Sequence, residues 1–120
     1  MCEIANISFN NYIWNAPIPL SLEEMKMLNK SDSGALKFKT RTLLPKKGNP
    51  NNYTLHNNYS TNNIALHNNG IQQCIYDIHK IKPNKPVFIS IYGTMNELKQ
   101  IIQKTNTLNY KILLEWNISC

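Results

Sequence analysis

Three side chains with chemical potential lie at the ends of apolar segments of the sequence. Lys39 follows the segment 35–38, and Asn117 and Cys120 follow the segment 112–116. A lysine can hold an anion, asparagine offers both a donor and an acceptor to an amide-like heterocycle, and a cysteine in an electropositive setting can be a base or a nucleophile. The spacing alone equally fits a solvated strand end, a turn residue and a chain terminus.

The segments that would position these side chains have strand patterns. Val87–Tyr92 is a continuous apolar, β-branched run between Pro86 and Gly93, which predicts a strand buried on both faces. Ala35–Thr40 and Lys111–Ile118 predict two further strands.

Three other segments have helical periodicity. Two begin with the pattern of a capping box, at Ser21–Glu24 and at Thr94–Glu97, and the third begins at Gly70. Ser33-Gly34 is expected to end the first helix, and Lys82-Pro83 the one that begins at Gly70. The apolar residues that share one helical face are, in chain order, Leu22, Met25 and Leu28; Ile71, Cys74, Ile75 and Ile78; and Met95, Leu98, Ile101 and Ile102.

The order of these elements is helix, strand, long loop, helix, strand, helix, strand. Alternating strands and helices predict an α/β fold of parallel strands, either a doubly wound sheet or a (β/α) barrel, with chemistry at the carboxyl ends of the strands. No GxGxxG and no GxxxxGK[ST] follows a strand, which favours the barrel. The polar stretch Thr42–Asn69 has little periodicity, and a loop of that length tends to be functional.

Composition limits the class of protein. With 120 residues, of which 42% are hydrophobic and 17% charged, residues 1–120 are expected to form a single soluble domain. Without an apolar run that could span a bilayer or a signal-peptide pattern, we expect a cytoplasmic protein with no membrane contact. Scattered cysteines and histidines predict no metal site. The net charge of +6 comes mostly from dispersed lysines, so we do not expect nucleic-acid binding.

Several segments resemble those of dihydroorotate dehydrogenases. The matching segments are 39–50 (KTRTLLPKKGNP, similar to K-[TS]-x-T-x-x-x-[KR]-x-G-N-P), 62–70 (NNIALHNNG, similar to N-[SA]-[MI]-G-L-x-N-x-G), 117–120 (NISC, similar to N-[LI]-S-C of the soluble class), Asn15-Ala16 (where the family has N-A-S-G), 33–36 (SGAL) and 86–93 (PVFISIYG). Their order and spacing agree with the family from about Asn15 to Cys120. The resemblance leans towards the fumarate-using soluble subclass, and the NAD-linked subclass is also compatible.

The resemblance implies the N-terminal portion of a (β/α)₈ TIM barrel that holds FMN at its strand ends. The family oxidises dihydroorotate to orotate in pyrimidine biosynthesis: a base removes the C5 proton while hydride passes from C6 to the flavin. By resemblance Cys120 would be the catalytic base, and Lys39 and Asn117 would contact both flavin and substrate. Asn62, Ile64, Ala65 and Leu66 would also contact the substrate. Ala16, Pro17 and Thr40 would also contact FMN.

The sequence also departs from the family pattern. Pro17-Ile18 replaces the Ser-Gly of the flavin loop, so that a backbone N–H and a glycine are lost, and Ala65 replaces a glycine beside the substrate. The later strands, which in the family carry a second lysine and the phosphate-binding glycines, do not occur in this chain. We therefore expect activity only if another polypeptide or a homo-oligomer completes the barrel. The alternatives are an inactive remnant and a small basic binding module.

Overall fold

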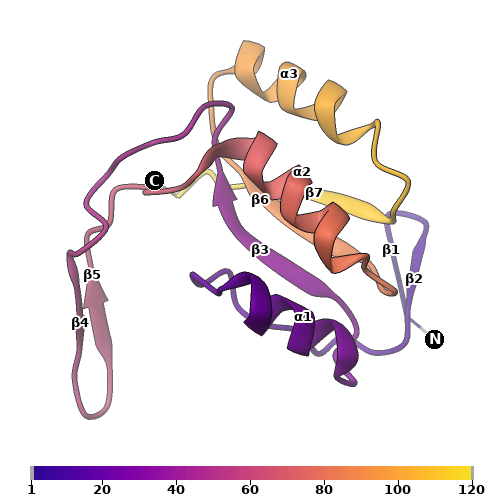
Figure 1. The fold of residues 1–120 in the computed structure, drawn as a ribbon, viewed down its shortest axis with the longest axis horizontal. Helices are drawn as coiled ribbons and strands as arrows, with labels where there is room; N and C mark the ends of the chain where they lie inside the picture. Colours follow the sequence, from indigo (N-terminus) through magenta and orange to yellow (C-terminus); the bar gives the residue numbers. More distant parts are fainter. Residues whose placement is uncertain (1, 120) are drawn as a thin grey trace.

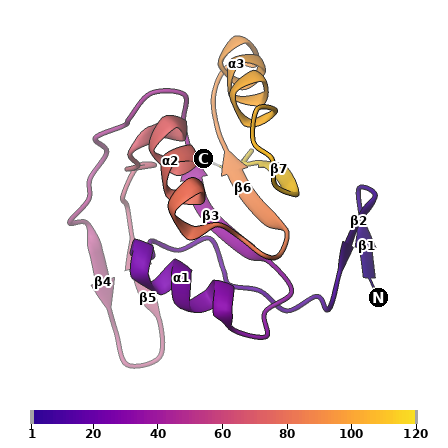
Figure 2. The ribbon, with the colours of Figure 1, turned by 45° about the vertical axis from the view of Figure 1, so that its right-hand side comes forward.

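The computed structural model describes residues 2–119, and Figures 1 and 2 show their arrangement in two views. In chain order the elements are β1 (Cys2–Ile4), β2 (Ile7–Phe9), α1 (Leu22–Lys30), β3 (Leu36–Arg41), β4 (Tyr53–Leu55), β5 (Ser60–Asn62), α2 (Gly70–Ile81), β6 (Val87–Ile91), α3 (Met95–Thr105) and β7 (Ile112–Trp116). Strands β3, β6 and β7 form a parallel sheet in that order, and β1–β2 and β4–β5 form antiparallel hairpins. The predicted α/β fold with parallel strands is confirmed.

The main core lies between this sheet and the helices. All five residues of β6 are buried, as its continuous apolar pattern predicts for a central strand. Side chains of α1, α2 and α3 pack in one cluster with Leu36, Phe38 and Ile89 of the sheet. The three helices therefore contribute to the same core, and Figure 1 shows α2 in front of the sheet with α1 and α3 to its sides.

Local signals in the sequence set the helix ends. Both predicted capping boxes form: Glu24 N–H donates to Ser21 Oγ at 3.1 Å while Ser21 N–H donates to Glu24 Oε2 at 2.7 Å, and Thr94 and Glu97 repeat the pattern. Helix α2 ends where Lys82 adopts a left-handed conformation before Pro83. Helix α1 ends at Lys30, earlier than the expected Ser33-Gly34.

The apolar face predicted for α3 is too wide. Met95 and Ile102 are 61% and 42% exposed, whereas Leu98, Ile101 and Thr105 are buried. A helix that contacts the rest of the molecule along one side buries a stripe at i, i+3 and i+7, and the flanking apolar positions stay in solvent. In α1, likewise, Met25 is buried and its predicted companions Leu22 and Leu28 are half-buried.

A hairpin that the sequence analysis did not predict covers part of the other face of the sheet. Phe9 of β2 stacks on Phe88 of β6 with ring centroids 5.8 Å apart, and Trp14 lies 5.0 Å from the same Phe88 ring. Leu113 completes this second apolar cluster. Gly34 permits the close approach, because a Cβ there would collide with the backbone of Asn11. The hairpin thus closes the amino-terminal end of the sheet and leaves the carboxyl ends open.

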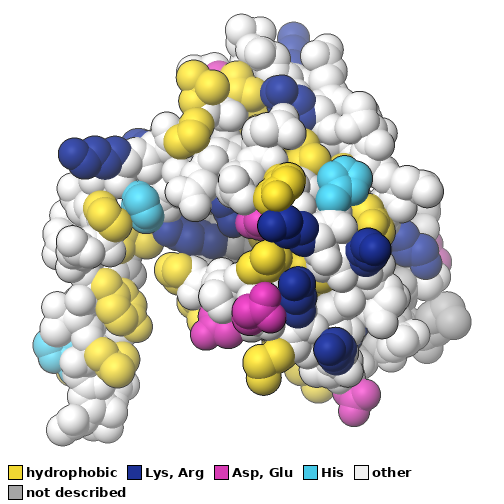
Figure 3. Space-filling model, viewed as in Figure 1, with side chains coloured by type: hydrophobic (Ala, Val, Ile, Leu, Met, Phe, Trp, Pro, Cys, Tyr) yellow, Lys and Arg dark blue, Asp and Glu magenta, His cyan; other side chains and the backbone are white. Residues whose placement is uncertain are grey.

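The stretch Thr42–Asn69 is not the unstructured loop that was predicted. It contains the hairpin β4–β5, whose residues are all exposed and which projects from the body at the left of Figure 1. The strand Ser60–Asn62 has no apolar alternation, which explains why the periodicity missed it. Hydrophobic side chains gather on this hairpin in Figure 3. Strand β7 is shorter than predicted, since it ends at Trp116 and not at Ile118.

Candidate functional site

A bulge in β3 aims the side chains at its carboxyl end. Phe38 pairs with Ile89 and Arg41 pairs with Ile91, so three steps along β3 match two along β6. One extra residue reverses the alternation of a strand, and such bulges often re-aim side chains beside functional sites. Because of it, Arg41 shares the helix side of the sheet with Phe38, and Thr40 reaches Ser90 on the opposite side.

Three polar side chains meet at the carboxyl ends of the parallel strands, one from β3, one from β6 and one from the residue after β7. Thr40 Oγ1 and Ser90 Oγ are 2.8 Å apart, and Asn117 Nδ2 donates to Thr40 Oγ1 at 3.1 Å. Thr40 and Ser90 are buried. Asn117 itself is fixed by the last bond of the sheet, from its N–H to Ile91 O at 2.8 Å. The predicted residues Thr40 and Asn117 are therefore in direct contact, and Thr40 also bonds to Ser90, which the sequence did not indicate.

The Asn117 amide is also held from its other side. Ser119 donates to Asn117 Oδ1 from its N–H at 3.0 Å and from its Oγ at 2.7 Å, as in an Asx turn. The chain therefore turns immediately after β7. The predicted base Cys120 lies outside the described residues, so its placement beside Asn117 stays a prediction.

Lys39 stands next to this cluster and contacts the loop 62–70. Its Nζ donates to His67 O. Burial and, second, the neighbouring Arg41 charge lower the pKa of the Lys39 ammonium from its ordinary value. Lys37 lies on the same side of the sheet as Phe88 and forms an ion pair of 2.8 Å with Glu115 of β7. Strand β3 thus carries two lysines with different partners. Lys37 is paired with a carboxylate, and Lys39 is bonded to a backbone carbonyl.

The loop that bonds Lys39 is held by buried polar contacts. The Asn68 side chain is buried and accepts from Gly70 N–H at 2.8 Å and Thr42 N–H at 3.1 Å, while it donates to Leu66 O at 2.8 Å. Neither Asn68 nor His67 was singled out in the sequence. An asparagine two residues before the glycine that starts a helix is the sequence signal that could have indicated Asn68, because such side chains often accept from nearby backbone N–H groups.

The residues predicted to line substrate occupy this loop in different environments. Asn62, the last residue of β5, and Ala65 are exposed, whereas Ile64 and Leu66 are half-buried. Ala65 and Leu66 both have positive φ angles, 51° and 57°, a conformation that costs non-glycine residues energy. The structure connects the loop to Lys39 through His67, and it keeps Asn62 on the projecting hairpin.

The predicted flavin loop lies beside the open edge of β3. Asn15 pairs with the backbone of Lys37 as a strand would: Lys37 N–H donates to Asn15 Oδ1 at 2.9 Å and Asn15 Nδ2 donates to Lys37 O at 2.7 Å. Ala16 and Pro17 follow and are exposed, and Ile18 N–H donates back to Ala16 O at 2.8 Å. This tight turn consumes the N–H of residue 18, and Pro17 offers none.

Other classes of site find no support in the described part of the chain. Residues 2–119 contain no group of three or more histidine, cysteine or carboxylate side chains placed to hold a metal ion. Within the same residues no helix has the length and apolarity needed to cross a membrane.

Comparison with known proteins shows the family of the chain. The family model described as dihydroorotate dehydrogenase matches residues 1–120. The chain belongs to the dihydroorotate dehydrogenase family. Its relatives include proteins named "Putative dihydroorotate dehydrogenase A (fumarate)" from Streptococcus equi subsp. equi, Streptococcus uberis and Streptococcus agalactiae, which are 31%, 33% and 30% identical to it.

The relatives are much longer than this chain. Each alignment covers 98% of the chain and 40% of the relative, so the chain spans about two fifths of their length. The three-stranded parallel sheet and three helices of this dihydroorotate dehydrogenase family member correspond to part of a TIM barrel. The resemblance stated from the sequence motifs is confirmed.

Proposed function

We propose that this chain forms one wall of an FMN-dependent site that oxidises dihydroorotate to orotate, and that the site works when a further polypeptide completes the barrel. The observation that carries the proposal is the cluster of Thr40, Ser90 and Asn117 at the carboxyl ends of three parallel strands, with Lys39 beside it. This edge is where barrel enzymes bind their ligands.

The polar groups at this edge fit a flavin and a planar heterocycle. Lys39 Nζ offers donors to the electron-rich end of a ring, and Thr40 and Asn117 offer a hydroxyl and an amide that are already fixed by mutual bonding. We propose that these three residues hold FMN, with Lys39 and Asn117 also contacting substrate. The flavin would supply the hydride acceptor, and the protein would supply orientation and a base.

Substrate binding would also use the loop after β5. In this proposal Asn62, Ile64, Ala65 and Leu66 line the substrate, and Cys120 removes its C5 proton. The hydrogen bond from Lys39 Nζ to His67 O supports the role of this loop in substrate binding, because the loop and the lysine would then move together. The names of the streptococcal relatives, which specify fumarate, support it as the electron acceptor.

The fit is poorer at the loop after Asn15. Pro17 has no N–H and the N–H of Ile18 is already bonded to Ala16 O, so these two positions present no free backbone donor to a flavin. We propose that Ala16 and Pro17 contact FMN through van der Waals packing alone. Binding of the flavin phosphate would then depend on residues outside this chain.

The edges of the sheet support the need for a completing polypeptide. Residues 111 and 117 bond to β6, so the alternate residues Ile112, Leu114 and Trp116 direct their backbone groups to the other edge of β7. That edge has no neighbouring strand among the described residues. An open parallel edge is a template for another strand. A polypeptide with the later strands would fit there, and a second copy of the chain is the other candidate.

The basic binding module has weaker support. On the face shown in Figure 3, lysine side chains are scattered and acidic side chains lie among them. Such a surface lacks the continuous basic stripe of nucleic-acid binders.

Flavin binding tests the proposal. The chain is mixed with a polypeptide that carries the remaining three fifths of a streptococcal relative, and FMN fluorescence is titrated. We expect stoichiometric quenching by the mixture and a Kd at least about tenfold weaker for Lys39→Met, from loss of charged hydrogen bonds. The exposed Lys46→Met is the matched control. Equal FMN binding by Lys39→Met, or none by a mixture that associates, would contradict the proposal.

A further inference from the structure

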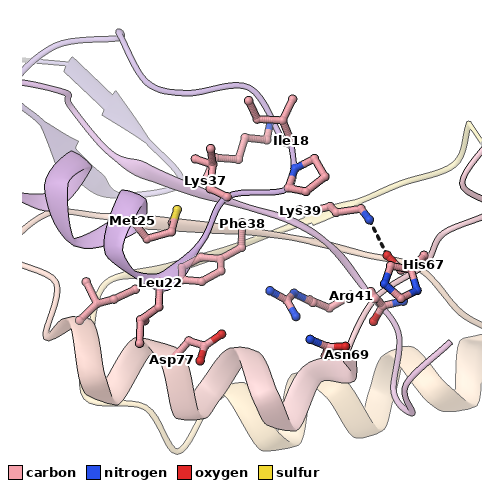
Figure 4. A pocket seen from close by; sticks show the side chains of 14 residues that line it. Ile18, Leu22, Met25, Lys37, Phe38, Lys39, Arg41, His67, Asn69 and Asp77 are labelled. Carbon is pink, nitrogen blue, oxygen red and sulfur yellow. Dashed lines mark hydrogen bonds between the residues drawn. The ribbon is translucent and has the colours of Figure 1, made fainter. Parts of the chain in front are cut away.

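A cavity of about 160 Å³ lies at the edge of β3, between this strand and the helices α1 and α2 (Figure 4). Its apolar wall includes the buried side chains of Phe38, Met25 and Ile81. Its polar lining includes Arg41 and Asp77. The cavity therefore combines apolar and charged side chains, as a site for a small amphipathic ligand would.

Arg41 reaches this cavity because of the bulge in β3. The shifted register places it on the helix side of the sheet, and Figure 4 shows its guanidinium pointing into the cavity towards α2. Its Nε is buried and has no hydrogen-bond partner among the described residues. A buried donor without an acceptor is unfavourable, and a guanidinium cannot lose its charge to escape the cost. The cavity thus contains a donor that lacks an acceptor.

The nearest acidic side chain in the cavity does not supply that acceptor. Asp77 Oδ1 accepts from Gln73 Nε2 one helical turn earlier, at 3.0 Å. No ion pair within 4.0 Å joins Arg41 to a carboxylate in the described part of the chain. Asp77 therefore lowers the net positive charge of the cavity but forms no ion pair with Arg41.

A second cation lines the same cavity. Lys39 is among the lining residues, its Nζ donates to His67 O, and burial and then the Arg41 charge lower its pKa. Two like charges that share a partly buried space destabilise each other, and an anion between them would relieve the repulsion.

We propose that the cavity binds a small organic carboxylate, whose anionic end pairs with Arg41 and whose apolar body packs against Phe38 and Met25. A carboxylate matches the planar fork of a guanidinium, and the apolar wall favours an organic body over inorganic phosphate. The proposed contacts with Arg41, Phe38 and Met25 involve none of the residues assigned to the flavin, and Lys39 is the one residue that the cavity shares with the proposed flavin site.

The single arginine of the sequence gives the test an unambiguous signal, its Nε–Hε resonance in an NMR spectrum. Benzoate is titrated into the isotope-labelled chain, with benzamide as the neutral control of the same shape and inorganic phosphate as the control without an apolar body. We expect benzoate to shift the Arg41 resonance saturably, and to bind about tenfold or more tightly than either control. No saturable shift with benzoate, or equal binding of benzamide or phosphate, would overturn the proposal.

Two variants separate the proposed contact from nonspecific binding. Arg41→Gln removes the charge and should weaken benzoate binding about tenfold or more, followed through the amide signals of α2. Asp77→Asn removes the competing carboxylate and should tighten benzoate binding severalfold, which keeps the proposal testable if Arg41→Gln does not fold. Unchanged affinity in a folded Arg41→Gln chain, or weaker binding by Asp77→Asn, contradicts it.

Discussion

At the scale of single residues, one extra residue in β3 gives the neighbouring cations Lys39 and Arg41 different surroundings. The bulge leaves Lys39 bonded to the loop carbonyl of His67 and turns Arg41 to the helix side. They nevertheless remain close enough for Arg41 to lower the pKa of Lys39. The charge state of Lys39 therefore reports on both the proposed flavin site and the cavity.

The pKa of Lys39 should lie below the ordinary 10.5 and should rise when Arg41 is replaced by glutamine. Since the unfolded chain then binds the Lys39 proton more tightly than the folded chain, stability should increase as pH rises towards 10.5. Side-chain NMR titration measures the Lys39 pKa in the wild-type chain and in Arg41→Gln. An unchanged Lys39 pKa in Arg41→Gln would show that the two charges do not interact.

Cys74 should be inert in the folded chain. Burial, the largest cause, raises the pKa of its thiol to about 12, and its side chain has no exposed surface. At pH 8 iodoacetamide should therefore modify the half-buried Cys2 and spare Cys74, as measured by peptide mass spectrometry with and without denaturant. Equal labelling of both cysteines in native buffer would contradict the packing of α2 on the sheet.

At the scale of elements, the edge of β3 is stabilised by a side chain in place of a strand. Asn15 satisfies both backbone groups of Lys37. These bonds tie the segment before α1 to the sheet and bring Ala16 and Pro17 to its edge. An asparagine that the family resemblance associates with the flavin loop therefore also has a structural role.

Replacing Asn15 by leucine should lower the free energy of unfolding by about 1–3 kcal/mol, because two partly buried hydrogen bonds to Lys37 are lost while side-chain size is kept. Asn15→Asp keeps the acceptor for Lys37 N–H and loses the donor, so it should have a smaller effect. Urea denaturation of the three chains gives the comparison. If Asn15→Leu is as stable as the wild-type chain, the pairing contributes nothing.

Periodicity and caps predicted the elements whose signals are local. The β-branched run of β6 and the capping boxes at Ser21 and Thr94 needed no tertiary information. The hairpin β1–β2 was missed because its reason to fold is the contact of Phe9 with Phe88, far away in sequence. The position of Ser90 and the bulge between Phe38 and Arg41 were missed for the same reason, since the register of β3 depends on its partner strand.

At the scale of the whole molecule, the sheet has one closed end and one open end. The hairpin β1–β2 covers the amino-terminal end with aromatic side chains, and the carboxyl end carries Lys39, Thr40, Ser90 and Asn117. Both outer edges of the three-stranded sheet lack a further strand among residues 2–119. This asymmetry is what a segment of a barrel requires if its ligand site lies at the strand ends.

The most direct test joins this chain to the part of a streptococcal relative that follows the matched region, and measures orotate formation from dihydroorotate with fumarate as acceptor. We predict turnover by the fused protein, with a rate about 10²-fold or more lower for Cys120→Ala, because a general base contributes about 10²–10⁴-fold. Cys2→Ala, at the closed end, should keep the rate of the parent. A folded, flavin-containing fusion whose turnover survives Cys120→Ala and Lys39→Met would contradict the assignment of this edge as the catalytic wall.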